Sequence, residues 1–248
     1  MSFSVLQNKP TLIVDPYPHI VIENALPIEL YEKLDREWPE DQLLKTTPYD
    51  NGICYRLKAD EMLKPNCVSD TWRQFCEYHT SKVFFDEVRQ IFGQYIDALE
   101  GKLGARGWAD KDASVWTDCQ TVMHKPINTT SRTAHIDNPM EMYAGLLYMR
   151  YNNDHSTGGD FQIHEAKNKI NKVDKSKGRQ IFEDDLGPVT TTVPYKANTF
   201  VMFCNSTPNA IHGVTPRKDA TMYRRSVNII AEYSRQSRKT MYKVTELK

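Results

Sequence analysis

The chain has 248 residues, of which 40% are hydrophobic and 26% are charged, an ordinary composition for a globular protein that buries a core. Lysine plus arginine and aspartate plus glutamate number 32 each, so no net charge draws the chain to nucleic acid or to a membrane surface. No apolar run reaches the roughly 18 residues that a transmembrane helix needs. We therefore expect neither a nucleic-acid partner nor a membrane association.

The cysteines and the first residues indicate the compartment. The five cysteines are widely spaced, and no two of them form a Cys-x-x-Cys pair. Neither a zinc ribbon nor a disulfide framework is therefore predicted. The chain begins without the basic segment, apolar core and small-residue cleavage site of a secretory signal. These features predict a cytoplasmic protein with free thiols.

The first half of the chain is expected to be mainly helical after a short extended start. Residues 27–39 begin and end at a proline, and Leu30, Leu34 and Trp38 recur every four residues, which is the core stripe of an amphipathic helix. Residues 69–101 carry a longer helical pattern that begins at a serine suited to an N-cap. Its length favours two helices.

After about residue 114 the pattern changes to short β-type runs separated by turn-rich stretches. The runs are 114–125, 142–151, 160–165, 189–195, 198–205 and 224–233. Strands that follow one another without helical patterns between them are typical of an antiparallel sandwich or barrel. We expect an α+β fold with a mainly β core.

These patterns predict a single domain over residues 1–248. Residues 1–115 form a mainly helical N-terminal support, residues 116–233 form the β core, and residues 234–248 form a polar, basic tail. The insert 166–187 is lysine-rich and then acidic, and we expect too few apolar residues in it to pack as a core element. It is either a solvated surface loop or a lid over substrate, and we predict a mobile flap.

Two residues of the stretch "RTAHIDNP", His135 and Asp137, can bind one metal ion. In an extended segment, residues two apart point to the same face, roughly 7 Å apart along the chain. His-x-Asp alone is a common pattern, so a third ligand is needed. His212 follows a strand and a turn and opens another extended segment, whereas His164 is a weaker candidate. Two histidines and one carboxylate are the ligand set of non-haem Fe(II) oxygenases.

A cation is also required if the cosubstrate is a dicarboxylic acid. Arg224 and Arg225 open the last strand, and a guanidinium can hold a carboxylate through two parallel hydrogen bonds. Arg224 shares its strand face with a serine and an asparagine, whereas Arg225 shares its face with a valine and an isoleucine. We predict Arg224 as the anchor and keep Arg225 as the alternative.

Several motifs in order resemble one family. "HIDNP", "LLYMRYNNDHSTGGDFQIH" and "VPYKANTFVMFCNSTPNAIHGVTP" are similar to the metal motif, the tyrosine strand with its Gly-Gly turn, and the distal-histidine region of the Fe(II)/2-oxoglutarate-dependent dioxygenases, in their prolyl hydroxylase-like branch. The resemblance covers residues 116–233. It implies a double-stranded β-helix, a jelly-roll or cupin-like barrel, supported by N-terminal helices.

The resemblance also implies roles for individual residues. His135, Asp137 and His212 would bind iron and form the catalytic centre, while Arg224 and Tyr148 would bind the cosubstrate. The expected reaction is the hydroxylation of an unactivated C–H bond, with 2-oxoglutarate converted to succinate and CO2. Fe(II), 2-oxoglutarate and O2 are the implied cofactors, with ascorbate as an accessory one. The substrate is open: a prolyl or other amino-acid side chain in a protein or peptide, a free amino acid, or a small metabolite.

Departures from the family leave two alternatives. The insert is longer than a compact member needs, and His124 and Lys125 stand where the family often has a tyrosine as second cosubstrate contact. The chain could therefore be a catalytically silent β-barrel binding protein. It could also be a cupin-type metalloenzyme that does not use 2-oxoglutarate. The oligomeric state is open.

Overall fold

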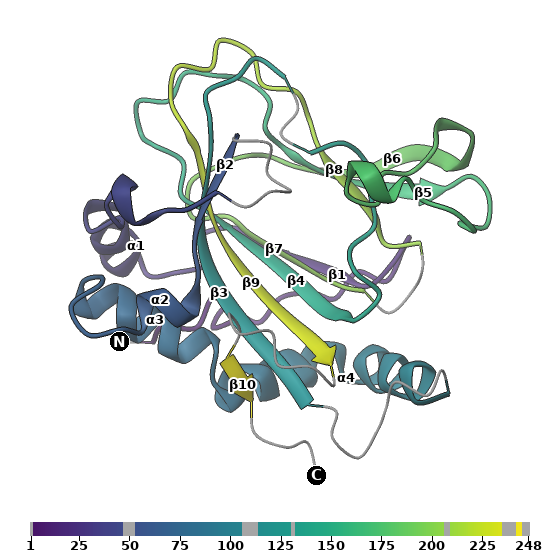
Figure 1. Cartoon of the computed structure of the whole chain (residues 1–248), viewed down its shortest axis with the longest axis horizontal. Coiled ribbons are helices and arrows are strands. Elements are labelled where there is room, and N and C mark those ends of the chain that lie inside the picture. The colour runs from purple at the N-terminus through teal and green to yellow at the C-terminus, as the bar shows by residue number, and fades with distance from the viewer. Residues whose placement is uncertain are drawn as a thin grey trace.

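Two antiparallel sheets and a layer of helices make up the chain in the computed structural model (Figure 1). The structure describes residues 2–46, 53–105, 114–129, 132–205, 209–234 and 242–244. Its α-helices are α1 (Ile28–Arg36), α2 (Ala59–Met62), α3 (Asp70–His79) and α4 (Lys82–Ala105). Short 3-10 turns are η1 (Asp41–Leu43), η3 (Lys175–Lys177) and η4 (Glu183–Asp185). The predicted mainly β core with antiparallel strands is confirmed.

The larger sheet has seven strands in the order β1-β7-β4-β9-β3-β10, with β2 paired to β3 as well. Their bounds are β1 (His19–Ile22), β2 (Cys54–Leu57), β3 (Ser114–His124), β4 (Glu141–Tyr148), β7 (Phe200–Cys204), β9 (Arg224–Ser234) and β10 (Tyr242–Val244). The two longest strands, β3 and β9, pair from one end to the other. They form the centre of the sheet.

The smaller sheet consists of β6 (Leu186–Val193), β5 (Phe161–Ala166) and β8 (Ile211–Val214), in that order. The helices lie on one side of the larger sheet, and the smaller sheet lies on its other side (Figure 1). Buried side chains from both sheets meet in one cluster between them: Tyr17, Ala144, Tyr148, Phe161, Ile163, Val193, Tyr195, Val201, Phe203 and Ala210. We call this cluster the inter-sheet core.

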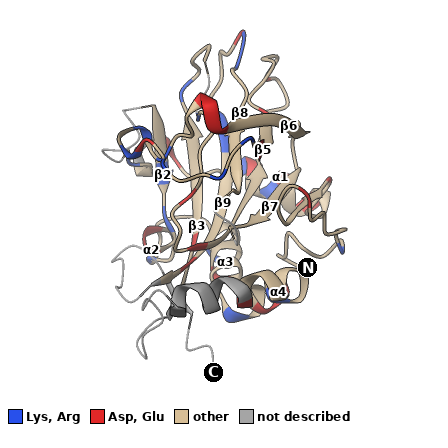
Figure 2. Ribbon diagram, turned by 90° about the vertical axis from the view of Figure 1, so that its right-hand side faces the viewer, with Lys and Arg blue, Asp and Glu red and all other residues tan. Residues whose placement is uncertain are grey.

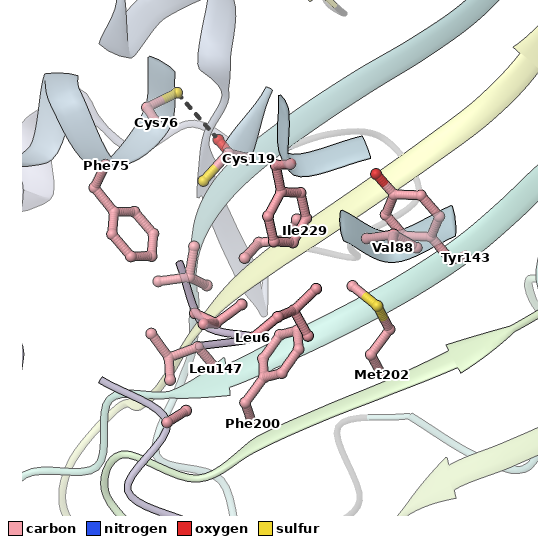
Figure 3. Close-up of a cluster of buried hydrophobic side chains, with 14 of the residues drawn as sticks. Leu6, Phe75, Cys76, Val88, Cys119, Tyr143, Leu147, Phe200, Met202 and Ile229 are labelled. Atoms are coloured by element: carbon pink, nitrogen blue, oxygen red, sulfur yellow. Dashed lines mark hydrogen bonds between the residues drawn. The ribbon is translucent and has the colours of Figure 1, made fainter. Parts of the chain in front are cut away.

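The helices cover the other face of the larger sheet. Phe75 and Cys76 of α3 and Val88 of α4 pack with Ile229 and Phe200 of the sheet (Figure 3). The N-terminus of α3 is capped as the sequence predicts. The Ser69 hydroxyl accepts the Trp72 backbone N–H at 3.3 Å, so one of the free donors of the first turn is satisfied.

Strand β9 shows how the sequence assigns its residues to the two cores. Because side chains alternate across a strand, Val227, Ile229 and Ala231 face the helices and are fully buried there. The residues at even-numbered positions of β9, which include Arg224 and Ser226, face the smaller sheet. The alternation therefore sends the two neighbouring arginines of β9 to opposite sides of the sheet.

The larger sheet draws strands from beyond the predicted core. β1 lies in the predicted extended start of the chain and pairs with β7. β2 comes from the part that the sequence predicts as mainly helical, and it pairs with the end of β3. Residues 242–244, expected in a polar tail, form β10 and pair with the beginning of β3. These strands are too short for their alternation to stand out in the sequence, and pairing with a long neighbour stabilises them.

The insert 166–187 differs from its prediction because it packs against the body of the protein. Ile170 and Ile181 are buried and form a small cluster with Ile136 and Ile211. Ala166, Val173 and Leu186 of the insert are partly buried and also pack against this cluster. The expectation that the insert has too few apolar residues to pack is wrong.

Charges of both signs are interspersed over the described surface, and the acidic turn η4 lies directly before β6 (Figure 2). This distribution agrees with the balanced charge of the whole chain. Within the described residues, no helix combines the length and the apolar character needed to cross a membrane.

Candidate active site

The segment that carries His135 lies beside β8 of the smaller sheet and is hydrogen-bonded to it. The His135 N–H donates to the His212 carbonyl at 2.9 Å, and the His212 N–H donates to the His135 carbonyl at 3.0 Å. The two residues thus form a hydrogen-bonded antiparallel pair, in which side chains stand next to each other on one face. Their ring centroids are 4.2 Å apart. Residues far apart in sequence therefore meet through one backbone pairing.

Asp137 completes a cluster of three potential ligands. Its Oδ1 lies 3.5 Å from His135 Nε2 and its Oδ2 lies 3.5 Å from His212 Nε2. One ligand atom from each residue lies within 4.8 Å of the other two. His135 and His212 are buried, whereas the Asp137 side chain keeps 17% of its surface exposed. The site therefore opens to solvent at the carboxylate.

The second nitrogen of each histidine is already bonded, which decides the atom available to a metal. His135 Nδ1 lies 2.8 Å from the Thr133 carbonyl oxygen, and His212 Nδ1 lies 3.0 Å from the Ala210 carbonyl oxygen. A carbonyl oxygen only accepts, so each Nδ1 carries the proton and each Nε2 keeps its lone pair. This outer shell is the usual support of metal-bound histidines.

The ionisation states also suit a metal. Burial lowers the pKa of His212 to about 3, which keeps its imidazole neutral. Burial alone would raise the pKa of Asp137, but His212, His135 and Arg132 hold that pKa well below its usual range. Neutral imidazole and ionised carboxylate are the forms that bind a divalent cation.

Aromatic side chains of the inter-sheet core form one wall of the cluster. The His212 ring stacks on Phe161 of β5 with ring centroids 5.4 Å apart, and it lies 4.4 Å from the Phe203 ring of β7. Tyr17 donates its hydroxyl to the Ile211 carbonyl at 2.9 Å. These contacts fix the His212 ring and exclude water from its far side.

Arg224 lies on the inner face of β9 and is 1% exposed. Its Nε donates to the Gly159 carbonyl at 2.9 Å, and its guanidinium carbon lies 5.0 Å and 4.9 Å from the ring centroids of Tyr148 and Tyr195. One of its terminal nitrogens, Nη2, and the Tyr148 hydroxyl have no hydrogen-bond partner among the described residues. Buried polar groups without partners are costly, so this pair is suited to receive a carboxylate.

Arg225 points to the helical face and is engaged there. Its Nε donates to the Met149 carbonyl at 3.0 Å, and its guanidinium forms an ion pair with Asp35 of α1. The guanidinium carbon also lies 4.7 Å from the Trp38 ring centroid and 3.6 Å from that of Tyr151. Arg225 therefore ties the sheet to α1, and the geometry favours Arg224 as the anchor.

The Gly-Gly turn before β5 supports Arg224. Gly158 has φ +74°, and a Cβ there would lie 2.0 Å from the Pro216 carbonyl oxygen. Only glycine fits this close approach. A buried ion pair between Asp154 and Arg217, 3.1 Å apart, stabilises the turn. The carbonyl of Gly159 is thereby positioned to accept from Arg224.

The structure places the three remaining candidates from the sequence in different surroundings. His124 lies opposite Arg224 in the register of β3 and β9, so the two side chains share the inner face of the sheet. Lys125 instead places its Nζ 5.5 Å from the Tyr55 ring centroid. His164 lies opposite Ile211 on β5 and is outside the ligand cluster.

Sequence reasoning missed two residues near the site. Tyr195 packs its ring under the Arg224 guanidinium, and it belongs to the motif "VPYKANTF", which marked it only as part of a strand. Arg179 lies in the insert and donates through its Nε to the Asp137 carbonyl at 3.0 Å. No local pattern could have indicated this contact, because it depends on how the insert folds back.

No protein-family model matches the chain, and no curated protein does so either. Among solved structures, the chain is similar to a prolyl-4-hydroxylase of Pseudomonas putida, at 14% identity and a TM-score of 0.49, over 90% of this chain and 96% of that one. It is also similar to the non-heme alpha-ketoglutarate-dependent epimerase SnoN from nogalamycin biosynthesis, at 8% identity and a TM-score of 0.49, over 86% and 76% of the two chains.

A third similar structure is a prolyl hydroxylase from Trichoplax adhaerens in complex with a peptide of the hypoxia-inducible factor. The identity is 13% and the TM-score 0.45, over 89% of this chain and 85% of that one. Neither the activity nor the substrate of these proteins transfers to this chain at such identities.

Proposed function

We propose that the chain is an Fe(II)- and 2-oxoglutarate-dependent dioxygenase that hydroxylates an unactivated C–H bond, and that its two sheets form a double-stranded β-helix within a single domain. The proposal rests on two features of the structure: a cluster of metal ligands and a buried site for an anion. The ligand cluster of His135, Asp137 and His212 has both Nε2 atoms ready for a metal. The buried Arg224 and Tyr148 offer unpartnered donors to an anion.

The donor set fits Fe(II). His135 and His212 would hold the ion through two imidazole nitrogens and Asp137 through its carboxylate, which is the ligand set of non-haem Fe(II) oxygenases. The hydrogen bonds from each Nδ1 to a carbonyl orient the rings before any metal arrives. Outer-shell bonds of this kind are typical of metal centres rather than of chance surface clusters.

The arginine supports 2-oxoglutarate as the cosubstrate. A dicarboxylate that is chelated at one end needs a cation for the other end, and a guanidinium offers two parallel donors. Arg224 is positioned by Gly159 and by two tyrosine rings, so little freedom is lost when an anion binds. The Tyr148 hydroxyl supplies a further donor to the same carboxylate.

The bound ion and cosubstrate would supply one kind of chemistry: O2-dependent hydroxylation of a C–H bond coupled to the conversion of 2-oxoglutarate to succinate and CO2. The chain's own residues orient the ligands, neutralise the cosubstrate charge and exclude water. The aromatic wall beside His212 performs the last task on one side. The five thiols are all free, which supports a reducing, cytoplasmic location.

The test combines metal analysis with a succinate-release assay over a panel of peptides and amino acids. The proposal expects Fe(II) to bind at one equivalent, and it expects succinate to form only with both 2-oxoglutarate and O2. Tight binding of both without any succinate would identify a silent binding protein. Substrate oxidation that does not need 2-oxoglutarate would identify a cupin-type metalloenzyme.

A further inference from the structure

The insert 166–187 closes the free edge of the segment that carries two of the candidate ligands. On one side, residues 134–136 pair with β8 through His135 and His212. On the other side, His135 is bridged to Gln180 of the insert. The Ile181 N–H donates to the Ala134 carbonyl at 2.9 Å. The ligand segment therefore lies between β8 and the insert and is hydrogen-bonded to both.

One residue of the insert reaches further along the segment, to Asp137. The Arg179 carbonyl accepts the Ile136 N–H at 3.4 Å, and the Arg179 Nε donates to the Asp137 carbonyl at 3.0 Å. The two bonds bracket the backbone around the carboxylate ligand. Within the described chain, Arg179 is the side-chain donor to that carbonyl.

The position of Asp137 explains why such a support is needed. Pairing with β8 reaches His135 but not Asp137. The next anchor to the body is at Asn138, whose carbonyl accepts from the Asn205 amide at 2.8 Å. The aspartate thus lies at the point where the chain leaves the sheet. Its carboxylate must nevertheless stay within 3.5 Å of both histidine Nε2 atoms.

The turn that presents Arg179 is built tightly. Asp174 and Gln180 are paired across it, and the Arg179 N–H donates to the Asp174 carbonyl at 2.9 Å. Arg179 has φ +67° and Gly178 has φ +62°, a region that an arginine rarely adopts. The Gly178 carbonyl also accepts from Arg132 Nη2 at 2.8 Å. These hydrogen bonds hold Arg179 in a conformation that it would rarely adopt alone.

We propose that Arg179 is a positioning residue of the metal centre. Its guanidinium and its carbonyl hold the stretch from Ile136 to Asp137, so that the carboxylate stays between the two histidines. The inference rests on the proposed function, since it assumes that these three residues bind a metal. It also gives the insert a role other than that of a lid over substrate. The insert supports the ligand segment through backbone and side-chain hydrogen bonds.

The experiment separates the contribution of the Arg179 side chain from the contribution of its backbone. Arg179→Gly tolerates the same φ and keeps the carbonyl bond to Ile136, but it removes the guanidinium. Lys172→Gly is the matched control, because it removes one charge from an exposed position of the same insert. Arg179→Lys tests for partial rescue. For each variant we would measure the Mn(II) dissociation constant, the visible spectrum of the Co(II) form and the unfolding temperature without metal.

Loss of an outer-shell partner typically weakens metal binding 10- to 100-fold. We expect Arg179→Gly to raise the Mn(II) dissociation constant by about that factor and to change the Co(II) spectrum. Arg179→Lys should fall between it and the wild type, and Lys172→Gly should match the wild type. The metal-free unfolding temperatures should agree among all four proteins.

The inference is wrong if Arg179→Gly and Lys172→Gly bind Mn(II) with the same affinity, whether that affinity equals the wild-type value or is lower in both. A lower metal-free unfolding temperature with unchanged affinity would make Arg179 purely structural. Failure of the proposed function has a different signature: the wild type would then bind Mn(II) no better than Asp137→Ala, and both proposals would fall.

Discussion

Arg224 and Arg225 are neighbours on β9, yet their guanidinium groups lie on opposite faces of the larger sheet. Arg225 is paired with Asp35, and its guanidinium carbon lies over the rings of Trp38 and Tyr151. Arg224 is equally buried but keeps a terminal nitrogen without a partner among the described residues. The same residue type therefore has a structural role at one position and a candidate binding role at the next.

Replacing each arginine by alanine should separate these roles. In Arg224→Ala, loss of a charge-assisted contact to a carboxylate costs on the order of 2–5 kcal/mol. The dissociation constant of 2-oxoglutarate for the Mn(II)-loaded protein should therefore rise by roughly tenfold or more. Isothermal titration measures this constant, and Mn(II) affinity itself should stay nearly unchanged.

Arg225→Ala is the matched variant. It leaves Asp35 without its partner, and breaking a buried ion pair costs about 3–5 kcal/mol, less where one partner is partly exposed. We expect a lower free energy of unfolding in urea and an unchanged affinity for 2-oxoglutarate. The reverse result, with cosubstrate binding lost in Arg225→Ala alone, would transfer the anchor role to Arg225.

Asp137→Ala should remove most of the bound iron and all succinate formation. The variant keeps both histidines but loses the carboxylate that lies 3.5 Å from each Nε2. Glu165→Ala removes an equal charge from an exposed position of β5 and serves as the control. Metal analysis after dialysis checks the outcome. Wild-type iron content in Asp137→Ala would show that the triad is assigned incorrectly.

Gly158→Ala should destabilise the fold and weaken cosubstrate binding together. The new Cβ would lie 2.0 Å from the Pro216 carbonyl oxygen, at a φ of +74°. The left-handed conformation alone costs an alanine about 1–2 kcal/mol, and the close contact adds to it. Gly93→Ala in α4 is the control, because nothing lies within 4 Å of its Cβ. Thermal unfolding should shift strongly downward for the first variant only.

His79 should make the protein sensitive to acid. The ring is fully buried, with Nδ1 2.8 Å from the Phe75 carbonyl and Nε2 accepting the Val5 N–H at 3.4 Å. Burial lowers the pKa of His79 to about 3. The stability of the neutral form is therefore present above pH 6.5, and it is lost as the pH falls toward the pKa of the folded state.

Each pH unit below 6.5 should cost about 1.4 kcal/mol. Between pH 7.5 and pH 5.0, the free energy of unfolding of the wild type should thus fall by about 2 kcal/mol more than that of His79→Gln. The comparison cancels the other titrating groups, which both proteins share. Parallel pH profiles in urea unfolding would contradict this account of His79.

Periodicity and turn residues were sufficient to predict the main elements. The two helices within 69–101 and the strands that became β3, β4, β7 and β9 follow from apolar spacing that is strong over many residues. The short strands β2 and β10 were less visible, because three or four residues carry little periodic signal. Pairing with a longer neighbour decides their conformation.

Part of the candidate site was also predicted from local patterns in the sequence. The two-residue spacing of His135 and Asp137 and the alternation along β9 are local properties that a strand converts directly into a shared face. Arg179 has no such signal. Its bond to the Asp137 carbonyl spans 42 positions in sequence, and it forms only because the insert folds back onto the ligand segment.

The sequence by itself determined the kinds of group that can meet at the site, and the order in which the strands present them. The folded chain decides which nitrogen of each histidine is available, which arginine is engaged with Asp35, and that the insert packs against the ligand segment. The physical reason is that each of these depends on a partner from another part of the chain. A carbonyl, a carboxylate or an isoleucine reaches its partner only after the sheets have assembled.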